Sequence, residues 1–194
     1  MITAHADVVG SLLRPAELLR AREELAAGRI TAAAFKEIED RAVDWAVRLQ
    51  EDSGVEVVTD GEMRRLSFQS QMTEAVEGFG SWDIDAFLWG EWHGVEGAED
   101  WRRERPTDIG VVGKLVRKRY LSAGEFVYLR ALTRCVPKIT LPSPGLFVNF
   151  WSPEASRDAY PTLDGFLADV VRILREEVEE LVRLGQRRIQ PGLA

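Results

Sequence analysis

The side chains of this sequence that could bind a transition metal are few and far apart. The chain contains two histidines and one cysteine, which are His5, His93 and Cys135. A catalytic zinc site needs three protein ligands of the His, Cys or Glu type and an open position for a substrate. The three candidates are widely scattered, so a hydrogen-bonded His5 and an inert, partly buried Cys135 are the simpler interpretations.

A second group of polar residues follows two short apolar stretches. Gly10 and Ser11 end the first stretch, and Glu62 comes just after the second. A backbone N–H and a serine hydroxyl can bind a carboxylate, whereas a glutamate can pair with an ammonium group. The alternatives are that Ser11 is only a turn residue before a helix and that Glu62 is a solvated loop carboxylate.

Two arginines, Arg64 and Arg65, follow in the same loop. A guanidinium group binds a carboxylate in a fixed two-point geometry, so both are candidates for contact with an anionic ligand. A solvated loop face is the alternative. Asp60 is expected to be a turn residue.

Composition excludes several classes of protein. The chain has 194 residues, 45% of them hydrophobic, and a net charge of -7, so we expect one folded domain without a basic stripe for nucleic acid. A single cysteine rules out an internal disulfide. The amino terminus does not read as a signal peptide, and charges interrupt every apolar run. We therefore expect a soluble, cytoplasmic protein without a membrane partner.

Helix signals are clear in three places. Pro15 suits a first helical turn, and the pattern predicts a helix over 16–27 that stops at Gly28. Thr31 is expected to cap a second helix that ends before Gly54. Its predicted buried stripe comprises Phe35, Ile38, Ala42, Trp45 and Leu49. Ser122 and Glu125 form a potential capping box for a helix to 134, and a last helix is predicted over 162–184, closed by Gly185.

Strand-like segments alternate with these helices. They are 6–11, 55–59, 109–115, 138–142 and a start at 187–190. The intervening segment 63–106 reads as a long connection rich in tryptophan, including Trp82, Trp89, Trp92 and Trp101. Such alternation predicts an α/β fold with a parallel sheet, either doubly wound or a barrel. A complete (β/α)8 barrel takes about 250 residues, so we expect a single partial domain over 1–194, the first half of such a barrel.

Several motifs carry a resemblance to a known family. The segment 5–15, followed by Val57-Val58-Thr59-Asp60-Gly61-Glu62-Met63-Arg64-Arg65, resembles the cobalamin-independent methionine synthases, especially their short, single-barrel members. The segments 112–115, 138–144 and 184–190 continue the resemblance in the same order. Together they cover nearly the whole chain.

This resemblance implies a methyltransferase that transfers a methyl group to a homocysteine-like thiol from a folate-like donor, with zinc holding the thiolate. Gly10, Ser11 and Glu62 match the family positions that hold the amino acid substrate. Arg64 and Arg65 could meet an acidic folate tail. The family's zinc ligands come from the second half of the barrel, so we expect no zinc on this chain alone and name no catalytic residue.

The carboxyl-terminal sequence departs from the family pattern. Family members continue from the Ile-Gln strand into an acidic turn, whereas Ile189-Gln190 here leads to Pro191 and the end at Ala194. We read this as a truncated chain. The alternative function is therefore a non-catalytic remnant, or a module that self-associates through its strand edges as a homodimer. A uroporphyrinogen-decarboxylase-type barrel is a further alternative, which the Gly61-Glu62 motif disfavours.

Overall fold

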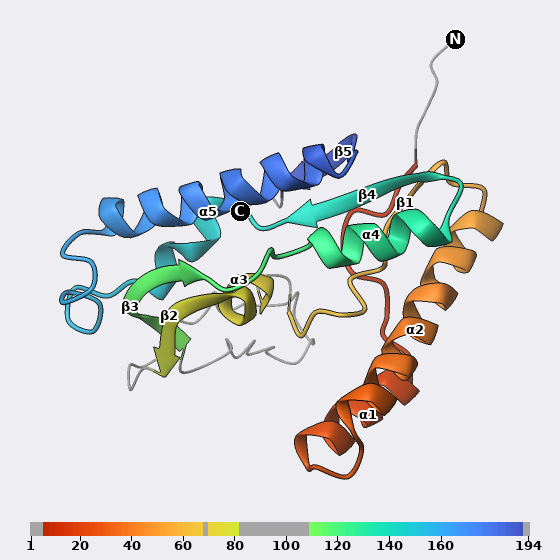
Figure 1. The fold of residues 1–194 in the computed structure, drawn as a ribbon, viewed down its shortest axis with the longest axis horizontal. Helices are drawn as coiled ribbons and strands as arrows, with labels where there is room; N and C mark the ends of the chain where they lie inside the picture. Colours follow the sequence, from red (N-terminus) through yellow and green to blue (C-terminus); the bar gives the residue numbers. More distant parts are fainter. Residues whose placement is uncertain (1–5, 68–69, 82–108, 192–194) are drawn as a thin grey trace, which may run out of the picture. The chain divides into compact units, whose positions relative to one another are not determined.

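The structure is a computed structural model that describes residues 6–67, 70–81 and 109–191 (Figure 1). The chain forms two compact units. Unit 1 comprises Met1–Met72, Tyr120–Ser143 and Leu174–Leu193, and unit 2 comprises Thr73–Arg119 and Pro144–Ile173 with Ala194. The prediction of a single partial barrel domain stays a prediction.

A parallel sheet forms the centre of unit 1. Its strands are β1 (Val57–Val58), β4 (Val136–Leu141) and β5 (Arg188–Pro191), in the order β1-β4-β5. Both strand pairs are parallel, as the alternation of helices and strands predicted. Because successive side chains of a strand point to opposite faces, Lys138 and Thr140 share one face of the sheet, and Ile139 and Leu141 share the other.

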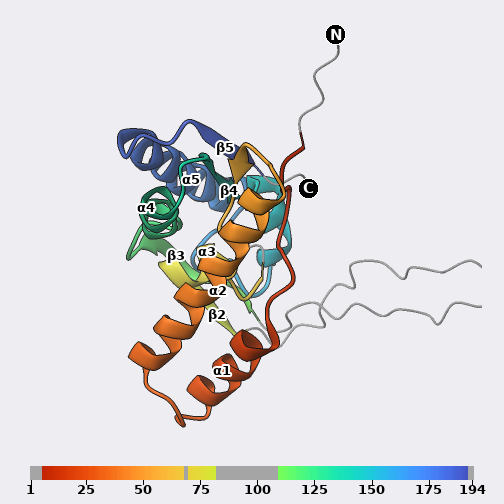
Figure 2. The same cartoon turned by 90° about the vertical axis from the view of Figure 1, so that its right-hand side faces the viewer.

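Helices pack against this sheet. α2 (Ala32–Asp52) contacts β1 and α4 (Ala123–Leu132) contacts β4, while α1 (Ala16–Ala26) packs on α2. The carboxyl-terminal part of α5 (Leu163–Arg183) contributes Leu181 to the core beside β4. Figure 2 shows α1 and α2 as a helical hairpin. One buried cluster joins α1, α2, α4 and β1 with the loop after β1, through Leu18, Ala42, Val43, Ala46, Val47, Val58, Met63 and Leu129. A second cluster joins β4, α4 and α5 through Phe126, Ile139, Leu141 and Leu181.

The predicted helix ends are confirmed for α1 and α2. Pro15 immediately precedes α1, and Gly28 has a φ of 68°, which a residue with a side chain rarely adopts. Thr31 caps α2, since its Oγ1 accepts a hydrogen bond from the backbone N–H of Ala34 at 3.2 Å. Gly54, with a φ of 76°, follows the end of α2.

The predicted buried stripe of α2 is wrong in its second half. Trp45 and Leu49 are 45% and 43% exposed, and Val43, Ala46 and Val47 are buried instead. The side chain of Gln50 helps to set this rotation. Its Nε2 donates to Thr59 O at 2.8 Å and its Oε1 accepts from Thr59 N at 2.9 Å, so this face of α2 points to the end of β1.

The capping box predicted at the start of α4 does not form. Ser122 precedes α4 without a capping bond from its side chain, and Glu125 points into a different network. The carboxylate of Glu177, from α5, replaces the box. It accepts the backbone N–H groups of Leu121 at 2.6 Å and Ser122 at 2.8 Å, where a helix amino terminus favours negative charge.

The segment 6–11 is not the strand that its apolar character predicted. Side chains hold it instead, together with a backbone bond of the next residue, Leu12. Lys138 Nζ lies 2.9 Å from Asp7 Oδ2, Gln190 Nε2 donates to Val9 O at 3.3 Å, and Leu12 N donates to Gly61 O at 3.1 Å. Unit 1 therefore has three described parallel strands rather than four and a fragment.

Unit 2 contains an antiparallel pair of strands. These are β2 (Val76–Ser81) and β3 (Ile109–Arg117), so the prediction that 109–115 continues the parallel sheet is wrong. A short helix, α3 (Ser70–Ala75), leads into β2, so residues 70–81 of the predicted long loop carry regular structure. The four tryptophans named above in that loop lie outside the described residues.

Gly78 is required at the irregularity between Glu77 and Phe79 in β2. Its φ is 105°, and a Cβ at this position would lie 2.7 Å from Lys114 O.

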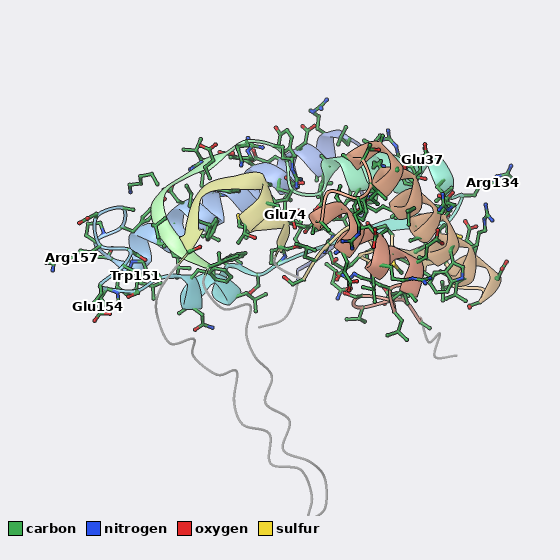
Figure 3. The ribbon with its side chains drawn as sticks, turned by 90° about the horizontal axis from the view of Figure 1, so that it is seen from below. Glu37, Glu74, Arg134, Trp151, Glu154 and Arg157 are labelled. Carbon is green, nitrogen blue, oxygen red and sulfur yellow. The ribbon has the colours of Figure 1, made fainter. Side chains whose placement is uncertain are left out.

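An aromatic core lies beside the strands, with ring centroids of Phe79 and Phe150 5.8 Å apart. Phe150 ends the 3-10 helix η1 (Pro144–Phe150), and the loop that follows carries Trp151, Glu154 and Arg157, which Figure 3 labels.

Across the parts of the chain that the structure describes, no helix carries an apolar stretch that could cross a bilayer.

Candidate functional site

The structure brings Ser11 and Glu62 together. The Ser11 hydroxyl donates to Glu62 Oε2 at 2.5 Å, across 51 residues of sequence. The adjacent backbone bond from Leu12 N to Gly61 O supports the same approach. Ser11 and its neighbour Gly10 are exposed, whereas Glu62 is 1% exposed. The alternative of a solvated Glu62 carboxylate is therefore wrong.

A tight turn after β1 presents Glu62. Gly61 and Glu62 have φ values of 68° and 55°, both in the left-handed region. Asp60 acts as the predicted turn residue, because its Oδ1 accepts the Glu62 N–H at 2.9 Å. A left-handed backbone costs about 1–2 kcal/mol for a residue with a side chain. Such residues concentrate at functional sites, which favours a role for Glu62 beyond packing.

The second oxygen of Glu62 is held from β4 and from the same loop. Thr140 Oγ1 donates to Glu62 Oε1 at 2.6 Å, and Arg65 Nη1 donates to it at 3.1 Å. Arg65 also donates to Thr140 Oγ1 at 2.8 Å, to Thr140 O at 3.0 Å and to Glu125 Oε2 at 3.0 Å. Glu62 is thus fixed through both oxygens, at the carboxyl ends of two parallel strands.

Thr140 and Glu125 were not among the sequence candidates. The alternation of Lys138 and Thr140 with Ile139 and Leu141 is a signal for Thr140, because it places polar side chains on one strand face. Lys138 belongs to the same polar face, where its Nζ also lies 2.8 Å from Gln190 Oε1 and the residue is 3% exposed. The sequence predicts a capping box for Glu125, whereas its carboxylate binds Arg65 and Gln71 from other segments.

Both candidate arginines are engaged by carboxylates of the chain itself. Arg64 binds Glu39 at 2.7 Å and Asp40 at 2.5 Å, and its side chain is 12% exposed. Its guanidinium also lies 4.6 Å from the centre of the Tyr128 ring. Arg65 is 1% exposed. The alternative of a solvated loop face is therefore wrong for both, and their contact with an anionic ligand stays a prediction.

Three carboxyl groups, those of Glu125, Asp60 and Glu62, act on the charge of Arg65. Burial raises the pKa of Glu125 to about 7, against the lowering effect of the Arg65 charge and with a further increase from the Asp60 charge. Burial by itself lowers the pKa of Arg65. The negative charges of Glu125, Asp60 and Glu62 outweigh this effect, so the pKa of Arg65 is raised above its ordinary value. Asp60 Oδ2 is buried without a hydrogen-bond partner. Burial therefore favours the protonated form of the Glu125 carboxyl inside this cluster.

The described residues do not fit a zinc site. No three His, Cys, Asp or Glu side chains in 6–67, 70–81 and 109–191 converge on a point where they could hold a metal ion. His5 and His93 lie outside these ranges, and Cys135 is partly buried with its Sγ 3.7 Å from Val55 O. Within the described ranges, no residue is therefore assigned to zinc.

The fold and this cluster define a class of protein, namely an α/β protein with a buried polar cluster at the carboxyl ends of parallel strands. No family model matches the sequence. The uncharacterized protein YxjH of Bacillus subtilis is 29% identical over 187 residues, which are 96% of this chain and 47% of YxjH. The 5-methyltetrahydropteroyltriglutamate–homocysteine methyltransferase of Thermosynechococcus vestitus is 30% identical over 182 residues, 94% of this chain and 22% of that protein.

A solved structure shares the fold. It is a candidate vitamin-B12-independent methionine synthase from Listeria monocytogenes, with a TM-score of 0.67 and 22% identity, and the match covers 97% of this chain and 52% of that one. The chain is therefore related to the cobalamin-independent methionine synthase family, and the predicted resemblance is confirmed. The chain spans about half the length of the curated relative YxjH.

Proposed function

We propose that this chain supplies the amino-acid-binding part of a methionine-synthase-like methyltransferase, which transfers a methyl group to a thiol acceptor. The observation that carries the proposal is the buried Glu62, held in a left-handed turn with one oxygen bonded to the exposed Ser11. The relationship to a homocysteine methyltransferase supports the substrate class. We further propose that β1, β4 and β5 are consecutive members of a (β/α)8 barrel.

The proposed binding step is an exchange of hydrogen bonds. In the free protein the Ser11 hydroxyl and Glu62 Oε2 satisfy each other. An α-amino acid carries an ammonium group for Glu62 Oε2 and a carboxylate for the released Ser11 hydroxyl and the backbone N–H groups at Gly10 and Ser11. The exchange adds an ion pair between the ammonium group and Glu62 Oε2, while the Ser11 hydroxyl exchanges one carboxylate acceptor for another. In this proposal the amino acid therefore binds where the Ser11 hydroxyl and Glu62 Oε2 meet.

The proposed reaction also needs a methyl donor and a group that activates the thiol. The family resemblance implies a folate-like methyl donor and zinc for the thiol. No described residue is assigned to zinc, and contact of Arg64 and Arg65 with an acidic tail of the donor stays a prediction. What the chain itself contributes is orientation, because fixing the α-carbon of the acceptor limits where its thiol can lie. The predictions that this chain alone binds no zinc and that it is cytoplasmic stay predictions.

A non-catalytic, self-associating module is the second candidate. Within the described residues, the order β1-β4-β5 leaves the outer edges of β1 and β5 without a strand partner. Exposed edges of this kind favour pairing with another chain. Native mass spectrometry distinguishes the candidates, since a metal-free dimer that binds no amino acid would support the module.

The test of the proposed function compares three ligands by isothermal titration calorimetry under reducing conditions. They are L-homocysteine, 4-mercaptobutanoate, which lacks the ammonium group, and 3-aminopropanethiol, which lacks the carboxylate. We expect the protein to bind L-homocysteine at least about tenfold more tightly than either analogue. 4-Mercaptobutanoate leaves the Glu62 carboxylate without an ammonium partner, and 3-aminopropanethiol leaves the Ser11 hydroxyl and the nearby N–H groups without a carboxylate.

Two variants assign the effect to the site. Glu62→Gln keeps the shape and a carbonyl oxygen but removes the charge, and should abolish the preference for L-homocysteine over 4-mercaptobutanoate. Glu37→Gln, at an exposed position of α2, is the matched control and should bind like the wild type. Equal affinities of the wild type for all three ligands, or no binding, would refute the proposal.

A further inference from the structure

We propose that Arg65 and Thr140 are positioning residues, which hold Oε1 of Glu62 and thereby leave Oε2 as the oxygen that recognises the ammonium group of the ligand. This inference rests on the proposed function. It concerns two buried side chains that do not themselves touch the ligand, one in the loop after β1 and one in β4.

A closed triangle of hydrogen bonds carries the inference. Thr140 Oγ1 donates to Glu62 Oε1 at 2.6 Å and accepts from Arg65 Nη1 at 2.8 Å, while the same Nη1 donates to Glu62 Oε1 at 3.1 Å. All donors of the triangle converge on Oε1. Oε2 instead accepts from the Ser11 hydroxyl, the one donor found for it among the described residues, which comes from the exposed amino-terminal segment. The two oxygens of one carboxylate therefore have different environments.

Two other arginines hold the backbone of Arg65. Its carbonyl oxygen accepts from Arg14 Nη2 at 2.8 Å and from Arg22 Nη1 at 2.9 Å. The other end of its guanidinium binds Glu125 Oε2 and Thr140 O, both at 3.0 Å. A planar guanidinium presents its donors in fixed directions from separate nitrogens, whereas an ammonium group donates from a single rotatable nitrogen. The position thus depends on the shape of arginine as well as on its charge.

Stability alone is a poor reason for this arrangement. Taking a guanidinium and carboxylates out of water carries a large desolvation cost, and apolar residues of similar volume often stabilise a protein equally well. A recognition carboxylate, in contrast, gains from partners that fix its orientation before the ligand arrives. The burial of Arg65 and Glu62, each 1% exposed, beside an exposed Ser11 matches this second purpose.

The experiment measures discrimination rather than affinity alone. For each variant, the Kd of 4-mercaptobutanoate is divided by the Kd of L-homocysteine, so that a general loss of structure, which weakens both ligands, cancels. Arg65→Lys keeps the positive charge but loses the planar set of N–H donors of the guanidinium group. Thr140→Val keeps the shape and loses the hydroxyl, and Thr140→Ser restores it. Arg41→Lys is the control for an arginine-to-lysine change, because Arg41 forms an exposed ion pair with Glu17 on the α1–α2 hairpin.

We expect the ratio to fall about tenfold in Arg65→Lys and in Thr140→Val, and to stay at the wild-type value in Thr140→Ser and Arg41→Lys. An unchanged ratio in folded Arg65→Lys and Thr140→Val would overturn the inference and leave the proposed function intact. If Arg65→Lys does not fold, the two Thr140 variants decide. A wild-type protein that does not discriminate between the two ligands overturns the proposed function, and the inference falls with it.

Discussion

Replacement of Glu125 by glutamine should change the pH dependence of stability in a defined direction. Burial raises the pKa of this carboxyl from its ordinary value of 4.5 to about 7 in the folded protein. Between these values the folded protein binds a proton that the unfolded chain has released. The free energy of unfolding of the wild type therefore falls as the pH rises through this window, and the contribution of the proton is lost above it.

The Glu125→Gln variant has no proton to lose. Its amide oxygen can still accept the hydrogen bonds that Glu125 Oε2 accepts from Arg65 Nη2 at 3.0 Å and Gln71 Nε2 at 2.8 Å. The unfolding free energy of the variant minus that of the wild type should therefore grow with pH. A full shift of this size corresponds to about 3 kcal/mol, so the difference should rise by on the order of 2 kcal/mol between about pH 5 and about pH 8.

Urea unfolding, followed by far-ultraviolet circular dichroism at both pH values, measures this difference. Titrating groups that do not interact with Glu125 cancel, because they are present in both proteins in the same surroundings. One of them is Asp40, where hydrogen bonds from Lys36 and Arg64 outweigh burial and lower the pKa. Glu37→Gln, at an exposed position of α2, is the control and should show no such dependence (Figure 3). A difference that is independent of pH, or that shrinks as the pH rises, would refute the reasoning.

Three further predictions concern single positions and are measured by chemical unfolding. Thr31→Ala should lower the free energy of unfolding by about 1 kcal/mol because α2 loses its cap, with Thr31→Ser near the wild type; an unchanged value would contradict the cap. Gly61→Ala should lower it by about 1–2 kcal/mol, because φ is 68° and the new Cβ would lie 3.1 Å from Ala46 Cβ; a stabilised variant would contradict the turn. Gly124→Ala should instead raise it by about 0.5 kcal/mol, since α4 has open space there, and a loss would show an unseen contact.

Local signals in the sequence were enough to predict several helix ends and the parallel strands. Thr31 caps α2 through a bond that spans three residues, and Gly28 and Gly185 adopt the positive φ expected after a helix. The strand at 138–142 was recognised from its own residues as well. These features depend on interactions within one or two helical turns or on the conformational range of a single residue, so they can be read without knowing the partner elements.

The amino-acid-binding role of Ser11 and Glu62 came from the family resemblance, and their contact came from the structure. The sequence placed each residue after an apolar stretch and left open whether Glu62 was solvated. The resemblance named both as substrate contacts, a role that stays a proposal. Their hydrogen bond requires the amino-terminal segment to lie beside the loop after β1, which the bond from Leu12 N to Gly61 O secures.

Only the tertiary structure decided which partners these elements meet. The predicted box of Ser122 and Glu125 did not form because Glu177, 55 residues from Ser122, reaches the start of α4 and leaves Glu125 to the cluster of Arg65. Thr140 joins Glu62 across 78 residues. A residue pattern specifies which face of an element is polar, but the free energy of a buried charge depends on which groups the fold brings against it. The sequence by itself determined where most elements begin and end, while the packing of distant segments decided what their polar side chains could do.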